Sequence, residues 1–189
     1  MHPAGVVYTV FLFPVLFIHS LRSHQKAQFM SAPTHRLTPD DLLPAVQGVL
    51  ETERDLIANL ANISALVFEA LPDLNWAGFY LLRQGELVLG PFQGRVACTR
   101  IPLGKGVCGT VAQSRTTLVV PDVHLFPGHI ACDAASASEI VVPLLAHGQL
   151  VGVLDLDSPR PNRFTPADQH LLEQVVALLA ATLPPSPLG

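Results

Sequence analysis

Two helix-start signals, one near each end, constrain the fold of this 189-residue chain more than any other feature. Thr38-Pro39-Asp40-Asp41 and Thr165-Pro166-Ala167-Asp168 each place a capping threonine before a proline, followed by an acid in the first helical turn. Apolar residues then recur at helical spacing over 42–50, 56–67 and 171–183. The sequence therefore predicts two helices at the beginning of the folded part and one at its end.

The segments between these helices have the pattern of β-strands. We expect strands at 76–82, 86–89, 95–101, 116–120, 138–145 and 150–156, with a short helix at 107–113. Gln84-Gly85 and His147-Gly148 suit hairpin turns. The stretch 121–137 has no clear period, and we interpret it as a long loop of the kind that usually carries function. This order predicts an α+β domain whose helices pack on one face of an antiparallel sheet.

The beginning of the chain departs from this pattern. Val6 to Ile18 is a strongly apolar run that Pro14 interrupts. It is shorter than the about 20 apolar residues of a membrane span, and no Lys or Arg precedes it as in a signal peptide. Three interpretations stay open: a signal or anchor, a docking segment, and, as the favoured one, an upstream extension before a functional start at Met30. We predict an extension over 1–36, a domain over 37–184 and a tail over 185–189.

Charge and cysteine content exclude several classes of function. A net charge of -4 without a run of Lys and Arg argues against nucleic acid as a partner, because phosphate binding needs a basic surface. Three cysteines are too few, and odd in number, for a secreted disulfide scaffold, so we expect a reducing, cytoplasmic location. Neither CxxC nor zinc-ligand spacing is present. His124 and His129 lack convincing further ligands and are interpreted as solvated loop residues, so we predict no metal site and no membrane partner.

The three cysteines are the first candidates for chemistry. Cys98 lies on an expected strand, Cys108 near the start of an expected helix, and Cys132 in the long loop. A cysteine is commonly a small core residue, but no core periodicity explains Cys132, and the helix dipole at Cys108 favours a thiolate. Thiol redox chemistry needs an attacking thiol and a second, resolving thiol. The sequence satisfies this requirement without specifying the roles.

Acids and aromatic residues form a second set of candidates. Asp155 and Asp157 are two apart on an expected strand and therefore face the same side. Glu139 opens the preceding strand, and the three carboxylates could raise one another's pKa or hold an ammonium group. The alternative for the aspartates is a solvent-facing pair or a turn cap. Trp76 and Tyr80 also share a strand face, either as packing residues or as an aromatic wall.

Four stretches of sequence resemble the GAF-domain free methionine-R-sulfoxide reductases: NWAGFYLL, GPFQGRVACTRIPLGKGVCGTVAQ, PDVHLFPGHIACDAASASEIVVPL and GQLVGVLDLDSP. The resemblance covers about residues 42–183. Many sensor domains share the GVLDLDS signature, whereas the three cysteines and the residues around the last one are more specific to the reductases. The alternatives are a non-enzymatic GAF sensor of a small ligand such as a cyclic nucleotide, and a purely structural dimerisation module.

The resemblance implies a GAF-like fold, with a central six-stranded antiparallel sheet flanked by helices, and a homodimer. It implies reduction of free L-methionine-R-sulfoxide with thioredoxin as reductant and without a cofactor. Cys132 would attack the sulfoxide, Cys98 would resolve the product, and Cys108 would be an auxiliary thiol. The substrate-binding residues that it implies are Trp76, Tyr80, Glu139, Asp155 and Asp157.

Overall fold

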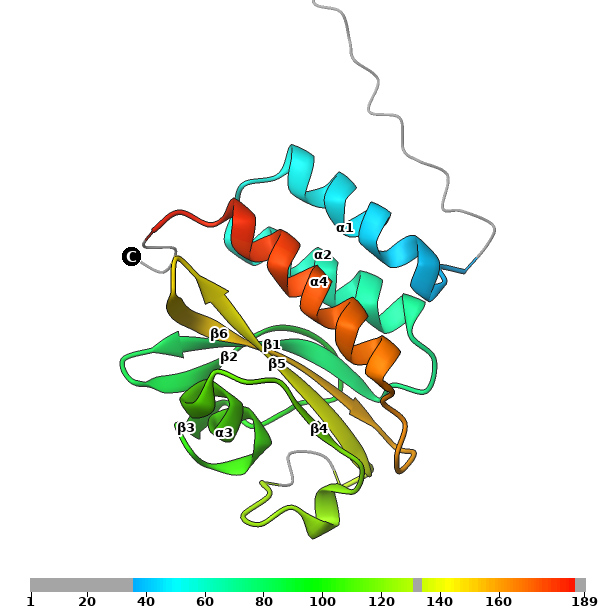
Figure 1. Ribbon diagram of the computed structural model, residues 1–189, viewed down its shortest axis with the longest axis vertical. Helices are drawn as coiled ribbons and strands as arrows, with labels where there is room; N and C mark the ends of the chain where they lie inside the picture. Colours follow the sequence, from blue (N-terminus) through cyan, green and yellow to red (C-terminus); the bar gives the residue numbers. More distant parts are fainter. Residues whose placement is uncertain (1–35, 131–133, 186–189) are drawn as a thin grey trace, which may run out of the picture. The chain divides into compact units, whose positions relative to one another are not determined.

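A computed structural model of the protein describes residues 36–130 and 134–185 (Figure 1). The α-helices in these ranges are α1 (Pro39–Thr52), α2 (Leu56–Ala70), α3 (Gly106–Ser114) and α4 (Pro166–Thr182). The strands are β1 (Trp76–Arg83), β2 (Glu86–Gly94), β3 (Arg100–Pro102), β4 (Leu118–Val120), β5 (Ser138–Ala146) and β6 (Gln149–Ser158). They form one antiparallel sheet in the order β3-β2-β1-β6-β5-β4, so the predicted six-stranded α+β fold is confirmed.

Both predicted helix-start signals form caps. Thr38 precedes α1 and donates its backbone N–H to the Asp41 carboxylate at 3.0 Å. Thr165 precedes α4, where its N–H donates to the Asp168 carboxylate at 2.8 Å and its hydroxyl accepts the Asp168 N–H at 3.2 Å. These reciprocal bonds satisfy backbone groups that the first helical turn leaves unpaired. Local sequence alone therefore sets where the first and last helices begin.

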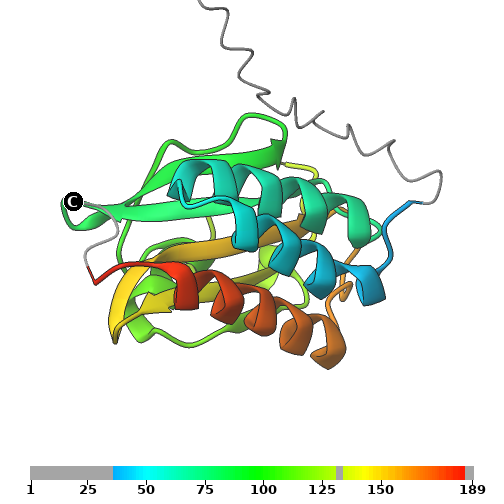
Figure 2. The same cartoon turned by 90° about the horizontal axis from the view of Figure 1, so that it is seen from above.

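The sheet is covered on both faces. The helices α2 and α4 pack on one face and α1 lies against both of them, whereas α3 packs on the opposite face (Figures 1 and 2). The prediction that the helices share one face is therefore wrong for α3. The physical reason is that the central strands are apolar on both sides: in β1, Phe79 belongs to the core under α1, α2 and α4, while its neighbour Tyr80 belongs to the core under α3.

The predicted strand over 95–101 is also wrong in its extent. The strand β2 continues to Gly94 instead of ending at Leu89, and β3 begins only at Arg100. Gly94 lies opposite Trp76 with a φ of 128°, and a Cβ there would lie 2.6 Å from the Asn75 carbonyl oxygen, so this strand end requires glycine. Residues after Gly94 leave the sheet, and Val96 is 87% exposed.

The predicted long loop over 121–137 contains a short 3₁₀ helix at Val123–Leu125, capped by Asp122. Residues 131–133 of this stretch, the extension over 1–35 with its apolar run and Met30, and the tail over 186–189 lie outside the described residues. None of the helices in the described ranges is both long and apolar enough to cross a membrane.

Candidate active site

Strand register brings the three predicted acids to the α3 face of the sheet. Glu139 on β5 lies opposite Asp157 on β6, and Asp157 lies opposite Trp76 on β1. Cross-strand partners share a face, and residues two apart on a strand do so as well, which adds Asp155 to the group. Glu139 and Asp155 are each only 6% exposed. The prediction of a shared carboxylate face is therefore confirmed, and the alternative of a solvent-facing pair is wrong.

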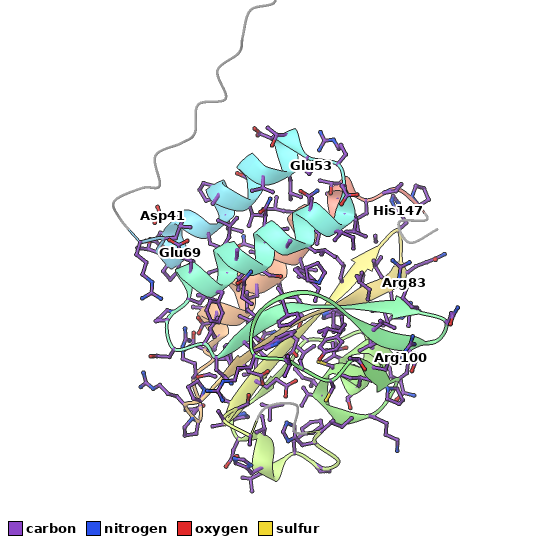
Figure 3. The ribbon with its side chains drawn as sticks, turned by 180° about the vertical axis from the view of Figure 1, so that it is seen from behind. Asp41, Glu53, Glu69, Arg83, Arg100 and His147 are labelled. Atoms are coloured by element: carbon purple, nitrogen blue, oxygen red, sulfur yellow. The ribbon has the colours of Figure 1, made fainter. Side chains whose placement is uncertain are left out.

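These acids line a small cavity between α3, the sheet and the segment that precedes residue 131. Its volume is about 30 Å³, enough for about two water molecules. The predicted residues Tyr80, Cys108, Glu139, Asp155 and Asp157 line it, whereas Trp76 and Cys98 do not. Most charged side chains lie elsewhere: Glu53, Arg83 and Arg100 are on the periphery of the domain (Figure 3). The cavity is therefore a place where acidic groups are buried rather than solvated.

Cys108 lies in the first turn of α3 and points toward two of the acids. Its side chain is 4% exposed, and its sulfur lies 3.8 Å from Oε1 of Glu139. The glycine that follows Cys108 explains this placement. A Cβ at Gly109 would lie 2.4 Å from the Pro102 carbonyl oxygen, so the glycine lets α3 pack directly against the end of β3. Gly109, the residue after Cys108 in α3, thus helps to position this thiol.

Burial changes the protonation of this group. It raises the pKa of Cys108 well above its usual value, and the negative charges of Asp155 and Glu139 raise it further. The expectation that the helix dipole favours a Cys108 thiolate is therefore wrong. Burial also raises the pKa of Glu139, with further contributions from Asp155 and Asp157, and it raises the pKa of Asp155 to about 7. Burial therefore favours the protonated form of Glu139.

Trp76 and Tyr80 form an aromatic stack that holds the segment after β2. Their ring centroids are 5.8 Å apart, and Phe92 stacks on Trp76 at 5.3 Å. The Tyr80 hydroxyl donates to the Cys98 carbonyl oxygen at 3.0 Å, and Nε1 of Trp76 donates to the Arg95 carbonyl oxygen at 3.2 Å. The packing interpretation of Tyr80 is confirmed, because the residue is 1% exposed. Tyr80 also lines the cavity, and its role as an aromatic wall for a substrate stays a prediction. Trp76 stacks on Tyr80 but does not line the cavity.

The two cysteines in the described ranges differ in state. Cys98 is half-buried and disulfide-bonded, whereas Cys108 is a free, buried thiol. Cys132 lies outside the described residues, so its predicted role as nucleophile stays a prediction. The structure brings Cys108, rather than Cys98, to the acids.

Three further residues with polar side chains line the cavity, and sequence reasoning did not place them there. They are Lys105, His129 and Ser136. The side chain of His129 is 16% exposed, and its Nε2 lies 3.9 Å from Oε2 of Glu139, so its interpretation as a solvated loop residue is wrong. Asn75 donates to the Ser136 hydroxyl at 3.0 Å across 61 residues of chain. No local signal could have indicated these contacts, because they join a loop to distant strands.

The fold and the acid-lined cavity define a class of protein. A GAF domain model matches residues 49–183, and the chain therefore belongs to the GAF-domain family. The free methionine-R-sulfoxide reductase of Escherichia coli is 53% identical over 143 residues, which are 76% of this chain and 87% of that protein. The protein of the same name from Saccharomyces cerevisiae is 43% identical over 148 residues, covering 74% and 82%. Within the class, the chain belongs with these reductases.

A solved structure supports the same placement. The free methionine-R-sulfoxide reductase of Staphylococcus aureus, in complex with its substrate, superposes with a TM-score of 0.74 at 48% identity. The match covers 78% of this chain and 97% of that one. The resemblance inferred from the four sequence stretches is therefore confirmed.

Proposed function

We propose that this protein reduces free L-methionine-R-sulfoxide to methionine, with thioredoxin as the reductant. The observation that carries the proposal is the small cavity in which Cys108 and three carboxylates meet, in a chain related to enzymes of that name. A sulfoxide oxygen needs a proton donor as its bond to sulfur breaks, and a free amino acid brings an ammonium group. The cavity offers a protonated acid for the first and carboxylates for the second.

Glu139 is the proposed proton donor. Burial raises its pKa and so favours the protonated form, which is the state that a general acid needs before the reaction. Asp157 lies on β6 directly opposite Glu139, and it is less buried than Glu139 and Asp155. It is therefore the proposed partner of the ammonium group. Asp155 would assist in both roles, because it helps to raise the pKa of Glu139 and adds a second acid for the ammonium group.

In the proposed reaction, the Cys132 thiolate attacks the sulfoxide sulfur while Glu139 protonates the oxygen. The oxygen ends on Cys132 as a sulfenic acid, and methionine leaves. The Cys98 thiol then attacks this sulfur, which forms a Cys98–Cys132 disulfide and releases water. Two thiol exchanges transfer the two electrons of the thioredoxin dithiol to that disulfide. The sum is sulfoxide plus reduced thioredoxin, giving methionine, water and oxidised thioredoxin.

The states of the other two cysteines support this division of roles. Cys98 is disulfide-bonded, and Tyr80 and Trp76 hold its segment against the cavity wall, as a resolving thiol requires. Cys108 is free, and its raised pKa leaves it a weak nucleophile at neutral pH. Cys108 is therefore proposed as an auxiliary thiol. A homodimer, which the resemblance implies, and a cytoplasmic location, which the cysteine content favours, complete the proposal.

The cavity argues against the sensor alternative. A cyclic nucleotide carries a negatively charged phosphate, and a buried site lined by three acids is a poor environment for an anion.

One assay tests the proposal: NADPH oxidation coupled through thioredoxin reductase and thioredoxin, with the free R and S sulfoxides supplied separately. We expect turnover of the free R form alone and no turnover of a peptide that contains methionine sulfoxide. Cys132→Ser should abolish the reaction, while Cys98→Ser should release about one methionine per chain and then stop. Equal rates with both isomers, or full activity of the Cys132 variant, would contradict the proposal.

A further inference from the structure

Three side chains of the cavity also form a cluster of possible metal ligands. Cys108 from α3, Glu139 from β5 and Asp155 from β6 each offer one ligand atom, and these atoms all lie within 4.8 Å of one another. All three side chains are buried. Buried thiol and carboxylate groups at this separation are the donors from which proteins build sites for divalent transition metals.

An unsatisfied atom in the same place points to a missing ligand. Among the described residues, Oδ1 of Asp155 is buried and has no hydrogen-bond partner, although the side chain lines the cavity. A buried carboxylate oxygen without a partner carries a desolvation penalty that a cation would remove. This observation is independent of the distances within the set.

We propose that Cys108, Glu139 and Asp155 form a binding site for a zinc ion. Zinc bonds of about 2.3 Å to sulfur and 2.0–2.2 Å to oxygen put tetrahedral ligand atoms roughly 3.5 Å apart. Cys108 Sγ and Glu139 Oε1 are already 3.8 Å apart. A thiolate ligand disfavours magnesium and calcium, which take oxygen ligands, and selects zinc or a similar metal.

Three protein ligands leave a fourth position in the coordination shell. His129 is the candidate on the protein side, because its Nε2 lies 3.9 Å from Glu139 Oε2. A water or substrate atom is the alternative for an open site. A zinc ion here would occupy the acids proposed to bind the sulfoxide. Zinc and the free sulfoxide would therefore compete for the cavity, an expectation that rests on the proposed function.

Cobalt is the probe of choice, because a thiolate ligand gives Co²⁺ a near-ultraviolet charge-transfer band that carboxylate and imidazole ligands do not give. The experiment uses the full chain with Cys98→Ser and Cys132→Ser, in which Cys108 is the only remaining thiol. We expect one Co²⁺ per chain with this band, and its loss when Zn²⁺ is added, since zinc binds such sites more tightly than cobalt. Adding Cys108→Ser should abolish the band.

Two cavity acids provide a matched pair of variants in the same background. Asp155→Asn should raise the dissociation constant by more than about tenfold, the loss that even an outer-shell partner can cause, and Asp157→Asn should raise it much less. Circular dichroism checks that each variant is folded. Absence of the band in folded protein, cobalt binding that survives Cys108→Ser, or equal effects of the two aspartate variants would each overturn the site in favour of adventitious surface binding.

Free methionine-R-sulfoxide separates this proposal from the proposed function. We expect the sulfoxide to weaken the cobalt band of the double variant competitively. A band that the sulfoxide leaves unchanged would uphold the metal site and count against the proposed substrate pocket. Sulfoxide reduction without any cobalt band would uphold the enzyme and overturn the metal site.

Discussion

The two faces of the sheet are built from the same strands but differ in what they bury. Under α1, α2 and α4 the core is a large apolar cluster that includes Phe79, Leu154 and Leu172. Under α3 a smaller apolar cluster includes Cys108 and adjoins Glu139 and Asp155. Burial is unfavourable for the charged forms of these three side chains. One face therefore stabilises the domain, while the buried acids of the other face lower its stability and form a polar cavity. Substitutions on the two faces should therefore separate activity from stability.

The largest expected effect is on the α3 face. Glu139→Gln removes the proposed proton donor, so kcat should fall by about 10²-fold or more, the usual contribution of a general acid. The free energy of unfolding should not decrease, because the variant removes an acid that is buried beside two others. Coupled turnover and urea denaturation measure the two quantities. A large loss of stability with nearly full kcat would contradict the assignment of activity to the α3 face.

The opposite face should give the opposite result. Leu172→Ala in α4 truncates a fully buried side chain and should lower the free energy of unfolding by about 2–5 kcal/mol. Turnover per folded molecule should stay unchanged. Leu125→Ala is the matched control, since this leucine is 80% exposed and its loss should change stability by about 0.5 kcal/mol or less. Similar destabilisation by both variants would contradict the assignment of the core.

The acids also predict how stability depends on pH. The pKa of Asp155 rises from 3.8 to about 7 on folding, so between these values the folded state binds more protons than the unfolded state. The free energy of unfolding contributed by this group is therefore fully present below about pH 4 and decreases as the pH rises to about 7. Glu139 acts in the same direction. Asp155→Asn should flatten this part of a pH series of urea denaturation curves, and an unchanged slope would contradict the raised pKa.

The smallest predicted effect concerns the tether of the Cys98 segment. Tyr80→Phe removes the hydroxyl that donates to the Cys98 carbonyl oxygen and keeps the ring, a loss worth about 1 kcal/mol and thus about fivefold in rate. In a single turnover, disulfide formation should slow while methionine release stays nearly unchanged. Trp76→Phe, which removes the bond to the Arg95 carbonyl oxygen, is the companion variant. If methionine release slows instead, Tyr80 acts on the substrate rather than on Cys98.

Local patterns allowed much of the fold and half of the site to be predicted. The threonine caps and the two-residue period of β6 gave correct helix starts and a correct shared face for Asp155 and Asp157. The segment after Gly94 was mispredicted as a strand because its exit from the sheet depends on close contact with Asn75, which apolar periodicity does not encode. His129 was misjudged for a similar reason, since its burial comes from a distant strand.

The sequence by itself determined the elements, because caps, turns and periodicity act over a few neighbouring residues. Only the tertiary structure decided which side of the sheet α3 covers, and therefore that Cys108 meets Glu139 across 31 residues of chain. It also decided the protonation of that pair. The local dipole of α3 favours a thiolate, but burial among carboxylates outweighs it, because desolvation of a charge depends on everything packed around the group rather than on its place in a helix.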